Sequence, residues 1–198
     1  MGQYYTAVLS AKNNRFLCAH PHTFGGNGAK LTEHSWIGNY FVSGVLRKLT
    51  GNPRRVWWLG DYATQENYKS SYSLSDSQKE QAEDTYSHCS GKTVGAFTSI
   101  MPGQIPGWNS WTFDNYYLIN WDKKSYVRLK PADPDRWELC PLPLLTAVGN
   151  GKGGGDYFGV NAEYVGIWAG DRISVKPALP VGCERFSDET QKYFFEEE

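Results

Sequence analysis

The chain has 198 residues, of which 40% are hydrophobic and 21% are charged, and this composition excludes an intrinsically disordered chain. Its 20 basic and 21 acidic side chains nearly cancel, whereas a protein that binds duplex nucleic acid needs a basic excess. No apolar run reaches the roughly 20 residues that cross a bilayer, and no signal peptide pattern is present. We therefore expect a single cytoplasmic domain over residues 1–198, with a frayed acidic tail at 187–198.

The four cysteines are far apart in the sequence and form no Cys-x-x-Cys pair. Without a secretory signal, this spacing predicts reduced thiols rather than a disulfide framework or a zinc site. These residues are Cys18, Cys89, Cys140 and Cys183.

Aromatic side chains are the unusual feature of the composition, with 8 Trp, 13 Tyr and 9 Phe, or 15% of the chain. Trp and Tyr combine an apolar body with a polar tip, so they suit interfaces and stacking sites. Aromatic residues also favour strands, and a β-rich core that uses them for volume explains the same numbers. Composition alone leaves both interpretations open.

The first residues predict a hairpin followed by a packed helix. Residues 3–10 and 15–19 are β-prone and flank a polar turn, which is typical of a hairpin. Residues 35–49 repeat apolar side chains at intervals of four, and Ser35 is the predicted N-cap of this helix. The apolar positions are Ile37, Phe41, Val45 and Leu49.

Two glycines inside the predicted helix, Gly38 and Gly44, lower its propensity and indicate that another element packs closely against it. Residues 54–59 then predict a strand. A polar, solvated helix is expected over residues 76–88, because its start has a pair with capping-box spacing. That pair is Ser77 and Glu80.

The second half of the chain adds strands. Residues 116–120 and 125–129 flank a polar turn and predict the clearest hairpin. Residues 139–148 are apolar but contain two prolines, so they predict an edge or irregular segment. Residues 165–175 predict a last strand region, interrupted at Gly170. Together these elements predict an α+β fold, with a mixed or mainly antiparallel sheet, one packed helix and one more exposed helix.

A glycine-rich loop is the strongest local signal, with five glycines among residues 149–155. Consecutive backbone N–H groups in such a loop form a nest for an anion, and a lysine inside it adds positive charge. The spacing matches neither a Walker loop nor a dinucleotide fingerprint, so either a flexible connector or a phosphate site is expected. The residues of that predicted site are Asn150, Gly151, Lys152, Gly153, Gly154 and Asp156, with Trp168 as the stacking partner.

A second cluster, formed by Lys30, Glu33 and His34, precedes the predicted packed helix. A helix N-terminus disfavours a positive charge, so it favours the neutral form of His34, while Glu33 can pair with Lys30. His20 and His22 are close by in the sequence, but their spacing matches no zinc signature. We therefore expect no metal site.

Gly-Asp pairs recur near predicted strand ends, at Asp61, Asp156 and Asp171. Three Asx-type turns explain them; alternatively, the aspartates lie at one rim of the sheet and receive ligand hydroxyls or a cation. No Gly-x-Ser-x-Gly elbow or Cys-His signature is present, so nucleophilic catalysis has no support. We assign no catalytic residue from the sequence.

Four segments are similar to blocks of a known family: residues 1–5, 30–36, 56–63 and 142–157. They contain MGQYY, KLTEHSW, VWWLGDYA and LPLLTAVGNGKGGGDY. They resemble an uncharacterised family of small bacterial and bacteriophage proteins, and the match covers most of the chain. The resemblance implies the cytoplasm of a bacterium, or of a phage-infected host, as the setting. It also draws attention to the acidic, histidine and glycine-loop candidates that lie inside these blocks.

Two main function hypotheses follow. In the first, the protein binds a small phosphate-bearing, nucleotide-like ligand without chemistry, and the glycine loop with Lys152 holds the phosphate. With the resemblance, such a phage protein would sequester a nucleotide signal of host defence. In the second, it is a nucleotide hydrolase or transferase that uses His34 and Glu33 as acid and base. A protein–protein inhibitor with an aromatic surface is a third interpretation. We expect no cofactor and no membrane or duplex nucleic acid partner; an oligomer is compatible with the sequence.

Overall fold

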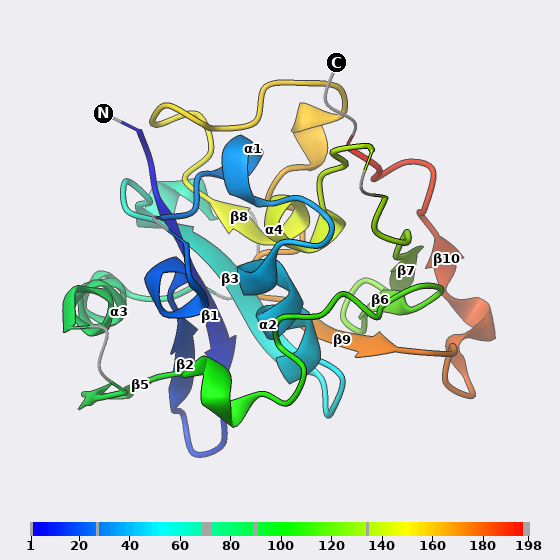
Figure 1. Ribbon diagram of the computed structural model, residues 1–198. Helices are drawn as coiled ribbons and strands as arrows, with labels where there is room; N and C mark the ends of the chain where they lie inside the picture. The colour runs from blue at the N-terminus through cyan, green and yellow to red at the C-terminus, as the bar shows by residue number, and fades with distance from the viewer. Residues whose placement is uncertain (1, 27, 69–72, 89–90, 134, 196–198) are drawn as a thin grey trace.

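The computed structural model describes residues 2–26, 28–68, 73–88, 91–133 and 135–195 (Figure 1). The helices are α1 (Leu31–His34), α2 (Tyr40–Lys48), α3 (Asp76–His88) and α4 (Pro141–Thr146). The strands are β1 (Tyr5–Ser10), β2 (Phe16–Ala19), β3 (Arg54–Gly60), β4 (Thr93–Val94), β5 (Phe97–Ser99), β6 (Tyr117–Asn120), β7 (Ser125–Arg128), β8 (Ala147–Val148), β9 (Arg172–Lys176) and β10 (Ser187–Asp188).

The strands of the described residues form one mixed sheet, in the order β10-β7-β6-β9-β3-β1-β2-β5-β4, with β8 paired to β3 beside that path. Most neighbouring strands are antiparallel, whereas the pairs β2–β5, β3–β8 and β7–β10 are parallel. The predicted α+β class and both predicted hairpins, β1–β2 and β6–β7, are confirmed. Lys124 takes a left-handed φ of 52° and so closes the second hairpin without a glycine.

The central strand β3 is buried on both faces of the sheet. Trp57 and Trp58 are adjacent in sequence and fully buried, and because side chains alternate along a strand they enter different hydrophobic clusters. Trp58 packs with α2 and α4, whereas Trp57 packs with Ala82 of α3. Helices therefore cover both faces of the sheet, and Figure 1 shows α2 in front of the central strands with α3 to one side.

The packed helix α2 is shorter than predicted. It begins at Tyr40, and the side chain of Asn39 caps it by accepting hydrogen bonds from the N–H groups of Phe41 and Val42. The predicted cap at Ser35 is therefore wrong, because α1 and a turn occupy the preceding residues. The burial of the four predicted apolar positions is confirmed: Phe41 and Val45 lie in α2, Leu49 caps its C-terminus, and Ile37 lies in the turn before it.

The two glycines that weaken the predicted helix have separate explanations. At Gly44, inside α2, an added Cβ would lie 2.4 Å from the ring of Phe24, so close packing is confirmed there. Gly38 lies before the helix in a turn with a φ of 94°, a conformation that side chains disfavour.

The polar helix α3 is confirmed over its predicted range, but its cap is different. Ser75 accepts from the N–H of Gln78, and the Gln78 side chain accepts from the N–H of Ser75, so the capping box lies two residues before the predicted one. Ala82 and Thr85 are buried, while most of the described side chains of this helix are exposed or half-buried. It is the more exposed of the two predicted helices.

Three predictions about the second half are corrected. Residues 141–146 form α4 rather than an irregular strand, because its prolines lie in the first turn, where backbone N–H groups need no helical partner. The last strand, β9, begins only at Arg172, since Gly166 and Gly170 have positive φ angles. The tail is packed where it is described: β10 pairs with β7, and Phe195 is buried. Residues 196–198 lie outside the described residues.

Cys18, Cys140 and Cys183 are free and buried, as the reduced-thiol prediction requires. Burial in apolar surroundings raises the pKa of Cys140 to about 12 and also raises the pKa of Cys18. Cys89 lies outside the described residues.

Candidate functional site

The backbone N–H groups of the glycine loop at residues 149–155 form an anion nest. The group that fills this nest is a carboxylate of the protein itself. The N–H groups of Gly151, Lys152 and Gly153 all donate to Oδ2 of Asp156, at 2.9, 2.9 and 2.8 Å. Three consecutive N–H groups around one carboxylate oxygen give the geometry that glycine permits and that a bound phosphate would otherwise require. The loop is thus closed on a side chain three to five residues further along.

The second oxygen of Asp156 connects the loop to the first strand. Oδ1 accepts hydrogen bonds from the Gln3 amide and from the Tyr5 hydroxyl, both at 2.9 Å. Burial, together with the negative charge of Asp156, raises the pKa of Tyr5 above its ordinary value. Gln3 is fully buried, donates to the carbonyl oxygen of Gly149 and accepts from the N–H of Tyr62.

This network corrects the predicted phosphate site. The N–H groups that were expected to meet a ligand are occupied, and the Lys152 side chain is exposed to solvent. Asn150 bonds both the N–H and the carbonyl of Tyr157, and Gly154 bridges to Gly2. The loop is neither a flexible connector nor an anion site open to a ligand. Its hydrogen bonds hold it in place and connect several of the four segments that resemble the known family.

The Lys30, Glu33 and His34 cluster lies against this loop. Thr32 of α1 donates to the carbonyl oxygen of Gly155 from both its N–H and its hydroxyl. Lys30 forms the predicted ion pair with Glu33 at 2.7 Å, and its stem packs so closely on Gly155 that a Cβ there would lie 2.5 Å away. The structure therefore brings the two predicted clusters together and uses the loop to support α1.

His34 differs from the rest of its cluster because its imidazole lines a cavity. Its Nδ1 accepts a hydrogen bond from the N–H of Lys30, so the neutral ring carries its proton on Nε2. Partial burial lowers the pKa of His34, which favours that neutral form. An imidazole of this tautomer has its donor at Nε2, and His34 is one of the residues that line the cavity.

The cavity has a volume of about 420 Å³ and lies where residues 21–26 and 28–29 face the start of α2. Glycine backbone forms much of one wall, and aromatic rings form another. Cavities of 300 to 1,000 Å³ with apolar walls and a few polar groups are typical of small-molecule sites. The side chains that matter below are Phe24, His34, Trp36, Asn39 and Tyr40.

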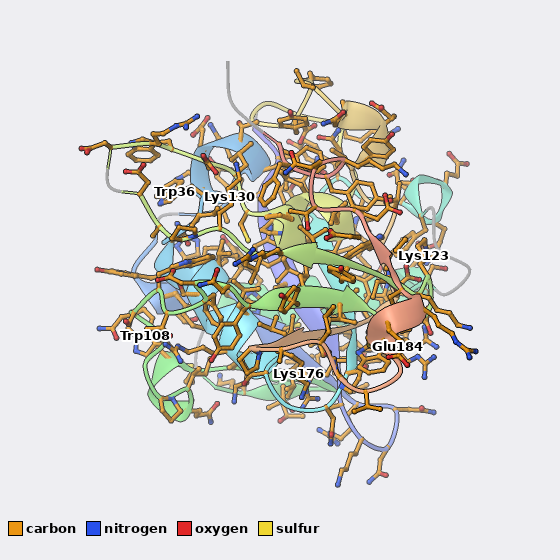
Figure 2. The ribbon with its side chains drawn as sticks, turned by 90° about the vertical axis from the view of Figure 1, so that its right-hand side faces the viewer. Trp36, Trp108, Lys123, Lys130, Lys176 and Glu184 are labelled. Atoms are coloured by element: carbon orange, nitrogen blue, oxygen red, sulfur yellow. The ribbon has the colours of Figure 1, made fainter. Side chains whose placement is uncertain are left out.

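The rings at the cavity contact one another at different angles, and some of them are open to solvent. Trp36 lies 5.9 Å from His34 with an interplanar angle of 30°, and Tyr40 is 54% exposed. Trp108 contacts two of the lining rings, with its own ring 5.6 Å from Phe24 and 5.8 Å from Tyr40. Figure 2 shows Trp36 and Trp108 toward the same edge of the molecule. Such rings can stack on a planar ligand.

The remaining predicted site residues lie elsewhere. Trp168 is fully buried and packs edge to face on Tyr193, so the prediction that it stacks on a ligand is wrong. Asp61 follows β3 and accepts from the N–H of Tyr4, whereas Asp171 bonds Val56 near the other end of β3. The aspartates therefore do not share one rim of the sheet.

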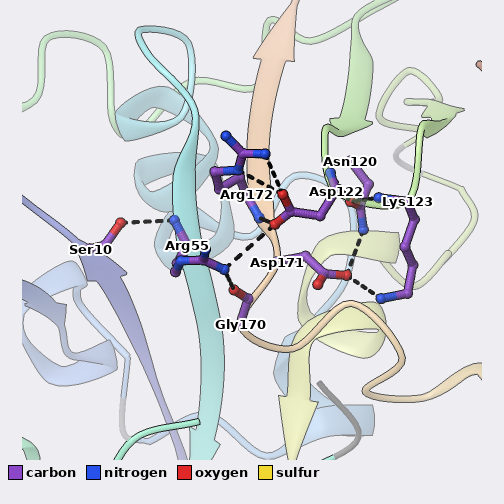
Figure 3. Close-up of polar contacts among 8 residues, drawn as sticks. All are labelled: Ser10, Arg55, Asn120, Asp122, Lys123, Gly170, Asp171 and Arg172. Atoms are coloured by element: carbon purple, nitrogen blue, oxygen red, sulfur yellow. Dashed lines mark hydrogen bonds and ion pairs between the residues drawn. The ribbon is translucent and has the colours of Figure 1, made fainter. Parts of the chain in front are cut away.

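Asp171 belongs to a structural network at the start of β9 (Figure 3). Its buried carboxylate accepts from the side chains of Asn120 and Lys123. The neighbouring Asp122 pairs with Arg172 and lies 3.6 Å from Arg55. These pairs fasten the β6–β7 turn to β3 and β9.

Among the described residues, no group of three or more His, Cys, Asp or Glu side chains is arranged to hold a metal ion. His20 is buried beside Thr6, and His22 is within hydrogen-bond distance of the hydroxyl of Tyr86 of α3, whose ring both imidazoles contact. Within the same part of the chain, no helix has both the length and the apolar character that a membrane crossing requires.

The sequence reasoning did not single out Trp36, Tyr40 or the glycines at positions 25, 26 and 28 that line the cavity. The sequence did contain a signal for this cavity. The three glycines come shortly before Trp36, and Tyr40 begins the helix that Asn39 caps. Comparisons with protein-family models, with curated proteins and with solved structures found no match to this chain.

Proposed function

We propose that the protein is a non-enzymatic binding protein for a small nucleotide-like ligand, whose planar ring enters the cavity beside Trp36. The single observation that carries this proposal is the 420 Å³ cavity, which combines aromatic walls with a fixed donor on His34. Aromatic side chains stack on any nucleobase, because every base has a π-face. The first turn of α2 also lines the cavity, and the positive end of a helix favours an anionic group there.

Binding is favoured over catalysis by the state of His34 and Glu33. A general base needs an unprotonated nitrogen toward the substrate, but Nδ1 of His34 already accepts from the N–H of Lys30. Glu33 is paired with Lys30 and is 52% exposed in its side chain, so it does not orient the imidazole. We therefore assign His34 to ligand recognition. In the setting that the family resemblance implies, the protein sequesters a nucleotide signal in a phage-infected cell.

The test is binding of adenosine 5′-monophosphate (AMP) by isothermal titration calorimetry. A Gly26→Leu substitution introduces a side chain into the cavity wall at a position without a positive φ, where a Cβ would lie 3.4 Å from its nearest neighbour. We expect wild type to bind and Gly26→Leu to lose at least about tenfold in affinity, or about 1.4 kcal/mol.

The matched control is Gly51→Leu, at an exposed glycine where a Cβ meets nothing within 4 Å. It should bind AMP as wild type does. Absence of AMP binding, or equal binding by Gly26→Leu, would overturn the proposal. Mass spectrometry of the recovered nucleotide tests the alternative, a hydrolase. Cleaved AMP after incubation with wild type, and intact AMP after incubation with His34→Ala, would show a hydrolase.

A further inference from the structure

A second cavity adjoins the first on the other side of Trp36. Its volume is about 290 Å³, and Trp137 and Arg136 line it together with Trp36. The two indole rings lie 4.7 Å apart with an interplanar angle of 56°. Trp137 is 65% exposed, so one of its faces is open to an occupant.

The two cavities share Trp36 and Gly38 in their walls. Gly38 has a φ of 94°, and the nearest atom to an added Cβ would be Cβ of Ala132 at 3.6 Å. Because Gly38 has no side chain, only backbone lies between the cavities at this point. One ligand can therefore extend from the first cavity to the second over this residue.

The second cavity also supplies the cation that the first one lacks. The Arg136 side chain is 64% exposed and lies 3.9 Å from Glu138, whose carboxylate has a closer partner in Lys130 at 2.8 Å. Asp133 lies in the same wall, but its carboxylate accepts from the N–H of Asp135 in a turn. A guanidinium with open donors is well suited to a phosphate oxygen.

We infer that the occupant is a dinucleotide that spans both cavities, and this inference rests on the proposed function. One base lies beside His34 and Trp36, the phosphate lies near Arg136 across Gly38, and the second base stacks on Trp137. Each cavity has an aromatic wall, and the pair with Arg136 matches a ligand with two rings joined by an anionic link.

The experiment compares AMP with adenylyl-3′,5′-adenosine (ApA) by calorimetry on the full chain. We expect ApA to bind at least about tenfold more tightly than AMP, because a second stacked base adds its own contact. Trp137→Ala should reduce ApA affinity by about tenfold and leave AMP affinity unchanged. Arg136→Gln should also weaken ApA binding. Because the side chains of both residues are exposed, neither change removes core packing.

Phe158→Ala is the matched control, since Phe158 is an exposed aromatic outside both cavities. It should bind ApA as wild type does. If AMP binds in the first cavity and ApA binds no more tightly, or if Trp137→Ala binds ApA as wild type does, the dinucleotide inference fails while the proposed function stands. If neither nucleotide binds, both fail.

Discussion

At the scale of single residues, Asp156 explains why five glycines occur in one short loop. Its two oxygens accept five hydrogen bonds, three from the backbone of residues 151–153 and two from Gln3 and Tyr5. The carboxylate in this way satisfies backbone and side-chain donors that would otherwise need another acceptor. The glycines permit the close approach, so the loop is an internal anion site.

This arrangement predicts that Asp156→Ala lowers the free energy of unfolding by about 2 to 4 kcal/mol in urea denaturation, because the five hydrogen bonds to its carboxylate are lost. The loss stays below the simple sum of the bonds, since Gly151 and Lys152 are exposed and water can reach their N–H groups. Lys152→Ala keeps its backbone donor and should change stability by less than about 0.5 kcal/mol.

A rescue measurement separates the nest from ordinary burial. Sodium formate should restore part of the stability of Asp156→Ala, because its carboxylate can occupy the vacated nest, whereas sodium chloride at equal ionic strength should not. No difference between the two salts would mean that the loop does not depend on a carboxylate.

At the scale of elements, adjacent residues of α2 have different surroundings: one packs in the core, and its neighbour lies beside the cavity. Phe41 is buried against Trp58, with ring centroids 4.8 Å apart, whereas Tyr40 projects outward beside the cavity. Consecutive helical residues point about 100° apart, so one turn can face both environments. Gly44 completes the buried side by admitting the ring of Phe24.

We therefore expect Phe41→Ala to reduce the free energy of unfolding by about 3 to 5 kcal/mol, the usual cost of deleting a core aromatic. The matched variant Tyr40→Ala, one residue away, should cost less than about 1 kcal/mol and should weaken AMP binding instead. Chemical denaturation and calorimetry measure the two effects. Equal stability losses for both variants would contradict the assignment of the two helix faces.

At the scale of the whole molecule, His20 lies between the sheet and α3. It is fully buried, its Nδ1 is 3.2 Å from the hydroxyl of Thr6, and its ring packs on Tyr86 at 4.9 Å. Burial, and to a smaller extent the charge of His22, lowers the pKa of His20 to about 4. Protonation of this imidazole therefore opposes folding of the entire domain.

The sign and window of the pH dependence follow from that value. Between pH 6.5 and pH 4 the unfolded chain binds a proton at His20 and the folded protein does not, so stability falls as pH falls. From pH 7 to pH 5 the loss from this group should be about 2 kcal/mol. His20→Gln should remove that part of the slope in urea titrations, whereas His22→Gln, at an exposed position, should largely retain it. An unchanged slope in His20→Gln would contradict the prediction.

Elements with strong local signals were predictable from the sequence. The short β-branched and aromatic run in RRVWWL predicted strand β3, and the polar turn between β6 and β7 predicted their hairpin, because both depend on neighbours in sequence. The caps of α2 and α3 were misplaced, since several Ser and Asn residues near each start satisfy the same pattern. The helix at α4 was missed because prolines in a first turn resemble those of an edge strand.

By itself, the sequence determined the α+β class and the strand at residues 54–59, and it offered an anion nest at the glycine loop as one of two interpretations, because these follow from side-chain pattern and backbone freedom over a few residues. Only the tertiary structure decided that the nest is filled by Asp156, that Trp168 is buried and that His34 lines a cavity with Trp36. Which donors remain free depends on contacts such as Gln3 with Asp156, which are 153 residues apart in the chain. Long-range packing determines those contacts, so a local sequence pattern cannot predict them.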